Sequence, residues 1–140
     1  MAVVVDTNIL VSGLITPHGP PGRILDLILT DAIQVAFDDR VLDEYSNVLS
    51  RPRFGFQAQQ IEALLDYFEI AGMRVNAGAL QPHPLPDPSD LPFIEVAVAS
   101  GAEALITGNE THFECLRGYG IPVLGPTDFL RSLGAAFPFP

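Results

Sequence analysis

The chain has 140 residues, 48% of them hydrophobic, which predicts one globular domain over residues 1–140 and excludes a disordered tail or a solvating linker. Aspartate and glutamate number 17 against 7 basic residues, all of them arginine, for a formal net charge of -10. A chain this acidic is a poor candidate for binding nucleic acid through its own basic side chains. Either a divalent cation or a basic partner offsets the carboxylates, or the acidity serves solubility alone.

The first predicted element is a strand over residues 2–5, because its Ala-Val-Val-Val run is typical of strands buried on both faces of a parallel sheet. The run stops at Asp6, Thr7 and Asn8, which are residue types that favour helix caps. Parallel sheets bind ligands beyond the carboxyl ends of their strands. Asp6 is therefore either a helix cap or a site residue.

Apolar spacing and turn residues predict the elements that follow. In chain order they are a helix over 22–30, a strand over 33–37, a helix that starts at Asp38 or Asp39 and ends before Arg51, a helix over 57–71, a short strand over 73–75, an irregular proline-rich loop over 82–92, a helix over 93–100, strands over 104–107 and 122–124, and a helix over 126–133. Alternating strands and helices predict an α/β fold with a mainly parallel central sheet flanked by helices, a three-layer α/β/α arrangement.

Two further acids stand at the edges of predicted apolar faces. At 100° per residue, Glu44 borders the apolar stripe of its helix, whereas Asp43 points to solvent. Asp90 lies at the start of the 93–100 helix on its apolar side, and Glu95 lies on the opposite side, toward solvent or an arginine. Taken singly, each of these acids also has an ordinary interpretation as a helix cap or a boundary residue.

Together, Asp6, Glu44 and Asp90 occupy three element ends that a parallel sheet can bring close to one another. Asp87, in the proline-rich loop, can approach the same crevice. Neighbouring carboxylates repel and raise one another's pKa values, and a hard divalent cation such as Mg²⁺ or Mn²⁺ removes that repulsion. Such an ion can orient a water, lower its pKa and stabilise charge on a phosphoryl group.

Several motifs stand in a fixed order along nearly the whole chain. They are VVVDTNILVS at 3–12, PP at 20–21, LDE at 42–44, RPRF at 51–54, DPSD at 87–90 followed by Phe93, TGN at 107–109, HF at 112–113 and GPTDFL at 125–130. This ordered set resembles the PIN domain, the nuclease fold of VapC-type toxins in bacterial toxin–antitoxin systems. A lone Asp-Thr-Asn would be weak evidence, but the ordered set is specific.

The resemblance implies a metal-dependent endoribonuclease that uses Mg²⁺ or Mn²⁺ to hydrolyse phosphodiester bonds of RNA. Asp6, Glu44 and Asp90 match the family's catalytic, metal-binding acids, and Asp87 matches an accessory acid. Asn109 stands where many relatives carry a fourth acid, so a complete second metal site is not predicted. Neutral polar side chains match supporting positions at Asn8, Ser12 and Thr107.

The resemblance also implies partners, namely an RNA substrate, a cognate antitoxin protein and, because PIN toxins commonly dimerise, a second copy of the chain. Two alternatives remain. A receiver domain or a haloacid-dehalogenase-like phosphatase also carries an aspartate after its first strand, but both ordinarily pair phosphate with a lysine, and this chain has none. A PIN-like scaffold that is weakened by the lost fourth acid would bind a protein partner instead.

The expected location is the cytoplasm, with no membrane segment. No apolar run approaches the ~20 residues of a membrane span. A signal peptide is not expected either, because no basic residues precede the first apolar stretch and Asp6 interrupts it. Cys115 cannot form an internal disulfide, and His18, His83 and His112 lack zinc-ligand spacing.

Overall fold

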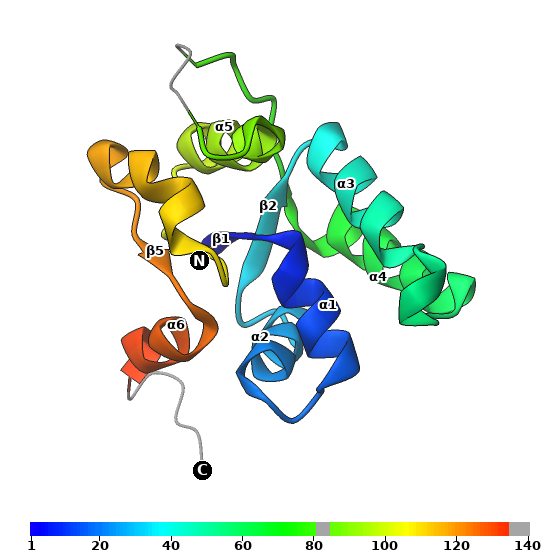
Figure 1. The fold of residues 1–140 in the computed structure, drawn as a ribbon. Helices are drawn as coiled ribbons and strands as arrows, with labels where there is room; N and C mark the ends of the chain where they lie inside the picture. Colours follow the sequence, from blue (N-terminus) through cyan, green and yellow to red (C-terminus); the bar gives the residue numbers. More distant parts are fainter. Residues whose placement is uncertain (81–84, 135–140) are drawn as a thin grey trace.

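The computed structural model describes residues 1–80 and 85–134, and Figure 1 shows its elements in the colours of the chain. In order they are β1 (Ala2–Val5), α1 (Thr7–Ile15), α2 (Pro20–Leu29), β2 (Gln34–Phe37), α3 (Asp39–Leu49), the 3-10 helix η1 (Pro52–Phe54), α4 (Ala58–Ala71), β3 (Met73–Arg74), the 3-10 helix η2 (Pro88–Asp90), α5 (Leu91–Ser100), β4 (Ala104–Ile106), the 3-10 helix η3 (Glu110–Tyr119), β5 (Val123–Leu124) and α6 (Pro126–Leu133).

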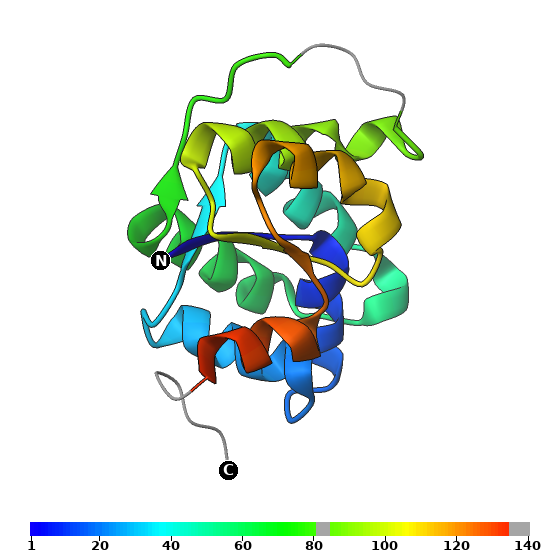
Figure 2. The same cartoon turned by 90° about the vertical axis from the view of Figure 1, so that its left-hand side faces the viewer.

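The five strands form one parallel sheet in the order β3-β2-β1-β4-β5. β1 is central, and Val3, Val4 and Val5 are completely buried, as a β-branched run between two helical layers requires. Figure 2 shows α5 and η3 over one face of the sheet and α2 and α6 over the other. The predicted three-layer α/β/α fold is confirmed.

Helix α1 is an element that the sequence did not predict. Its residues are apolar on several sides, so no amphipathic period marks it. Ile9 and Leu10 are buried in the core, and Gly13 packs closely against α2. A Cβ at Gly13 would lie 2.6 Å from the Leu25 side chain, which explains why this interior helical position is glycine.

The other differences concern prolines and short helices. α2 begins at Pro20 instead of residue 22, and α5 begins at Leu91 instead of residue 93, because proline fits the first turn of a helix. The proline-rich stretch contains η2, and η3 had not been predicted. The remaining predicted elements match the observed bounds to within one residue. Pro82, His83 and Pro84 lie outside the described residues.

In the part of the chain that the structure describes, no helix has the length and apolar character needed to cross a membrane.

Candidate functional site

Asp6 and Thr107 lie side by side at the carboxyl ends of β1 and β4. The strands pair with Val5 opposite Ile106, so the residues that follow are neighbours. The Thr107 hydroxyl donates a hydrogen bond to Asp6 Oδ2 at 2.7 Å. Asp6 occupies the N-cap position of α1, as one of its two interpretations predicted, but among the described residues its side chain makes no cap hydrogen bond.

Glu44 reaches this edge of the sheet from α3. Its side chain is half-buried and Asp43 is exposed, as the helical phase predicted. The next residue, Tyr45, is fully buried, and its hydroxyl donates to the Val5 carbonyl. Burial raises the pKa of the Tyr45 phenol, so the hydroxyl stays protonated and remains a donor. This hydrogen bond fixes α3 to the last residue of β1, next to Asp6.

Asp87, Asp90 and His112 meet at the start of α5. Asp87 caps η2 by accepting hydrogen bonds from the Ser89 amide at 3.0 Å and the Ser89 hydroxyl at 2.7 Å. Asp90 stands at the N-cap position of α5 without a side-chain cap hydrogen bond. Its Oδ2 instead lies 3.0 Å from Nδ1 of His112, which belongs to η3.

These side chains line one cleft of about 400 Å³. The sequence-predicted residues along it are Asp6, Asn8, Ser12, Glu44, Asp87, Asp90 and Asn109. Thr107 is buried and joined to the cleft through its hydrogen bond to Asp6. The fold therefore brings the selected residues to one edge of the sheet.

The cleft also has lining residues that were not predicted as site residues. The polar and aromatic ones are Thr7, Arg51, Arg53, Phe54, Ser89, Phe93 and His112. The motifs at 3–12, 51–54, 87–90 and 112–113 contain most of them, so the sequence signal was present. The motifs did not indicate that these segments lie around the same cavity.

Burial and mutual charge shape the electrostatics of the cleft. Burial raises the pKa of Asp6, and the charge of Asp87 adds to that shift. Burial also raises the pKa of Asp90, with contributions from the charges of Asp6 and Asp87. Hydrogen bonds from Ser89 lower the pKa of Asp87. Carboxylates that oppose one another's ionisation in this way favour binding of a divalent cation to the folded chain.

The donor atoms of the cleft fit a hydrated divalent cation. Ligand atoms of Asp87, Asp90 and His112 lie within 4.8 Å of one another, and Asp6 and Glu44 line the same cleft outside this group. The Thr7 hydroxyl is buried at the cleft and has no hydrogen-bond partner among the described residues. An orphaned buried hydroxyl costs free energy, which a water on a bound ion would recover.

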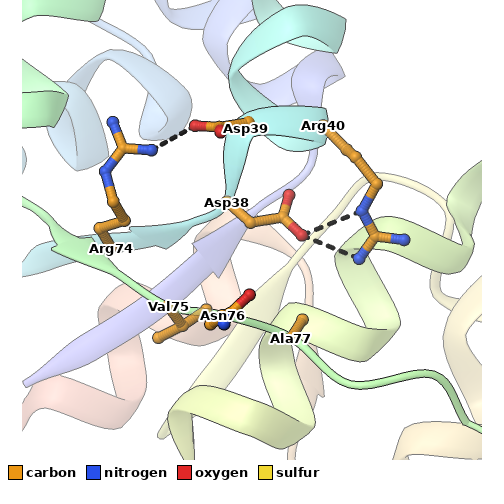
Figure 3. Close-up of a pocket in the computed structure, with 7 residues that line it drawn as sticks. All are labelled: Asp38, Asp39, Arg40, Arg74, Val75, Asn76 and Ala77. Atoms are coloured by element: carbon orange, nitrogen blue, oxygen red, sulfur yellow. Dashed lines mark hydrogen bonds and ion pairs between the residues drawn. The ribbon is translucent and has the colours of Figure 1, made fainter.

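A second cavity, of about 450 Å³, lies beyond the ends of β2 and β3. Figure 3 shows that two ion pairs occupy its wall, in which Arg40 faces the Asp38 carboxylate and Arg74 faces Asp39. Asp38 also caps α3 by accepting from the Val41 amide, as predicted. Because protein carboxylates already pair both arginines, this cavity is a weaker candidate for binding an anion than the acidic cleft is for binding a cation.

Glu95 connects Arg40 of this second cavity to α5. Arg40 donates to Glu95 Oε1 at 2.7 Å, and the Leu80 amide donates to Glu95 Oε2 at 2.8 Å. Of the two predicted surroundings, solvent or an arginine, the arginine is confirmed, and Glu95 is 4% exposed. The contact joins α3, which carries Glu44, to α5, which follows Asp90.

The chain is similar to known proteins in sequence and in fold. The family model described as PIN domain matches residues 2–111. An uncharacterized protein of Methanocaldococcus jannaschii is 32% identical over 111 residues, which cover 77% of this chain and 70% of that protein. The fold is similar to a chain in the crystal structure of VapBC2 from Rickettsia felis bound to a DNA fragment from their promoter, with a TM-score of 0.56, 20% identity, and coverage of 89% of this chain and 98% of that chain.

Proposed function

This chain belongs to the PIN domain family, and we propose from that premise that it is a metal-dependent endoribonuclease. The observation that carries the proposal is the acidic cleft at the ends of β1 and β4. Buried Asp6, half-buried Glu44 and Asp90 line it together, and the pKa values of Asp6 and Asp90 are raised mainly by burial. Carboxylates in this state favour a bound divalent cation, which is what metal-dependent phosphodiester hydrolysis needs.

In this proposal, Asp6 and Asp90 hold Mg²⁺ or Mn²⁺ directly or through water, and Glu44 completes the set of ligands. The bound ion supplies a water of lowered pKa and positive charge for the phosphodiester. Thr107 holds the Asp6 carboxylate in place through its 2.7 Å hydrogen bond. Asp87, whose pKa is lowered by Ser89, adds an accessory negative charge. Neutral polar support comes from Asn8, Ser12 and Asn109.

We further propose that the chain is the toxin of a toxin–antitoxin pair. The motif resemblance to VapC-type toxins supports this role, and so does the fold similarity to a chain from the VapBC2 structure. The partners are then an RNA substrate, a cognate antitoxin protein and a second copy of the chain in a homodimer. A small antitoxin reading frame beside the gene would support the toxin role, whereas a solitary gene would favour a PIN nuclease outside such a pair.

The purified chain is expected to cleave single-stranded RNA only with Mg²⁺ or Mn²⁺ present. Gel analysis of an end-labelled RNA should show products with either ion and none with a chelator. Glu44→Gln should lower the cleavage rate by roughly 10²-fold, because it removes one anionic group from the site. The matched control is Glu62→Gln, which neutralises an exposed glutamate on α4.

A folded protein that binds metal but cleaves no RNA would contradict the ribonuclease proposal. The alternative, a PIN-like scaffold that binds a protein partner, would then replace it.

Restoring the fourth acid with Asn109→Asp is expected to change stability in opposite directions with and without metal. Asn109 is exposed and lines the cleft, and its backbone N–H donates to the Thr107 hydroxyl at 2.9 Å. An added carboxylate should tighten Mn²⁺ binding by roughly threefold to tenfold, because it is a hard anionic ligand. Without metal, it should lower the melting temperature through repulsion from the cleft acids. Calorimetric titration and thermal melts measure the two effects.

Asn47→Asp provides the control, because Asn47 is exposed on α3 and does not line the cleft. If both aspartate variants behave alike, the Asn109 side chain does not face the metal site. The roles proposed for Asp6, Glu44 and Asp90 would then depend on their own tests.

A further inference from the structure

Residues 51–56 form a turn between α3 and α4 that lies beside the acids of the cleft. We call this turn the rim segment. Arg51, Arg53 and Phe54 from it line the cleft together with Asp6 and Glu44. The rim segment contains η1, which is followed by Gly55, whose φ of 67° is in the left-handed region that favours glycine. The turn thus brings two arginines to an otherwise acidic cavity.

The two rim arginines have no acidic partner among the described residues. Elsewhere in that part of the chain, carboxylates pair with Arg40, Arg74, Arg117 and Arg131. Over residues 1–80 and 85–134, neither Arg51 nor Arg53 has a carboxylate within ion-pair distance, although the net charge of the whole chain is -10. Their charge is therefore available to an anionic ligand in the cleft.

Aromatic rings accompany this charge. The Arg53 guanidinium lies 4.8 Å from the centroid of the Phe54 ring. Phe54 stacks on Phe56 with centroids 5.7 Å apart and planes 18° apart. Phe56 packs against the core, whereas Phe54 is half-buried at the cleft. Guanidinium planes and aromatic rings are the groups on which unpaired nucleobases stack.

We propose that the rim segment is the binding site for single-stranded RNA next to the metal cleft. Arg51 and Arg53 hold two backbone phosphates, and the Arg53–Phe54–Phe56 stack receives a nucleobase. This inference rests on the proposed ribonuclease function and names the form of its substrate. A duplex fits less well, because its bases are already stacked and cannot reach the rings, and because two arginines are few for a duplex surface.

The test measures binding of a fluorescently labelled single-stranded RNA, and of the same sequence as a duplex, by anisotropy at several salt concentrations. Asp6→Asn serves as the background with Mg²⁺ present, so that cleavage does not interfere. The double variant Arg51→Gln/Arg53→Gln should weaken single-strand binding by about tenfold or more. It should also make the salt slope, which is the fall in log binding constant with log salt concentration, smaller by about 1.4, or about 0.7 for each lost phosphate contact. Phe54→Leu should weaken binding by roughly tenfold and leave the salt slope unchanged.

Arg131→Gln is the matched control, because it removes an exposed arginine on α6 that does not line the cleft. It should leave both affinity and salt slope at their parental values. Thermal melts of every variant confirm that folding is retained. The duplex should bind about tenfold more weakly than the single strand.

The inference would be overturned if the double variant bound single-stranded RNA with the affinity and salt dependence of its parent. It would also be overturned if the duplex bound as tightly as the single strand, or if the protein bound no RNA. The cleavage assay in the wild-type background separates this inference from the proposed function. If RNA binding depends on the rim arginines but the protein shows no metal-dependent cleavage, only the ribonuclease proposal is contradicted. If the variant without both arginines cleaves and binds RNA as well as the parent, only the rim site is contradicted.

Discussion

Asp6→Asn is expected to lower RNA cleavage by on the order of 10³-fold while the protein stays folded. Asparagine keeps the shape of the side chain, and its carbonyl oxygen can still accept the hydrogen bond that Thr107 now donates to Asp6 Oδ2. The substitution removes the buried negative charge at the end of the central strand, on which the proposed metal site depends. Single-turnover cleavage with Mn²⁺ measures the loss.

The same substitution is expected to stabilise the metal-free protein at neutral pH. Burial raises the pKa of Asp6 in the folded state above its value in the unfolded state. The protonated form of Asp6 therefore favours folding at low pH, and this contribution to stability is lost as pH rises through the raised pKa. Above that pKa, the ionised carboxylate destabilises the fold. Removing its charge should therefore raise stability at neutral pH and have less effect in acid.

With metal bound, the parent should become more stable than Asp6→Asn, the reverse of the order expected without metal. A ligand that binds only the folded state at a hundred times its Kd adds about 2.7 kcal/mol to stability. The parent should gain this with Mn²⁺, whereas Asp6→Asn should gain less. Asp43→Asn removes an exposed carboxylate from α3 and should resemble the parent in every measurement. Parental cleavage by Asp6→Asn, with a matched circular dichroism spectrum, would remove Asp6 from the proposed catalytic role.

Arg40→Met is expected to lower the free energy of unfolding by about 2 kcal/mol. Glu95 is almost fully buried, and Arg40 is its cationic partner among the described residues. Removing one member of a buried pair leaves an uncompensated charge, which costs ~3–5 kcal/mol where both partners are buried. The Arg40 side chain is 45% exposed, so solvent screens part of the interaction and the expected loss is smaller.

Denaturant unfolding and thermal melts measure this loss, which corresponds to a melting temperature lower by about 6 °C. Arg131→Met breaks an exposed pair with Asp128 and should leave the melting temperature nearly unchanged. Adding Glu95→Gln to Arg40→Met should recover part of the stability, because Glu95 is then neutral and Asp38 is the carboxylate that still lacks its arginine. Equal melting temperatures for Arg40→Met and the parent would show that solvent already compensates Glu95.

Local sequence was enough to predict the parts of the fold that depend on near neighbours. The valine run defined β1, and its end placed Asp6 at the carboxyl edge of the sheet. The helical phase of α3 correctly separated half-buried Glu44 from exposed Asp43. Both inferences depend only on the periods of strand and helix, which a few consecutive residues determine.

The tertiary structure decided the features that join distant segments. Glu95 is buried against Arg40, which lies 55 positions away; the helical phase predicted solvent or an arginine but did not indicate which arginine or that Glu95 would be buried. His112 contacts Asp90 because η3 and α5 pack on the same face of the sheet. The rim arginines come from a turn that is near the cleft acids only after folding. Ion pairs and the lining of a cavity depend on how different elements pack together. The periodicity within a single element does not indicate that packing.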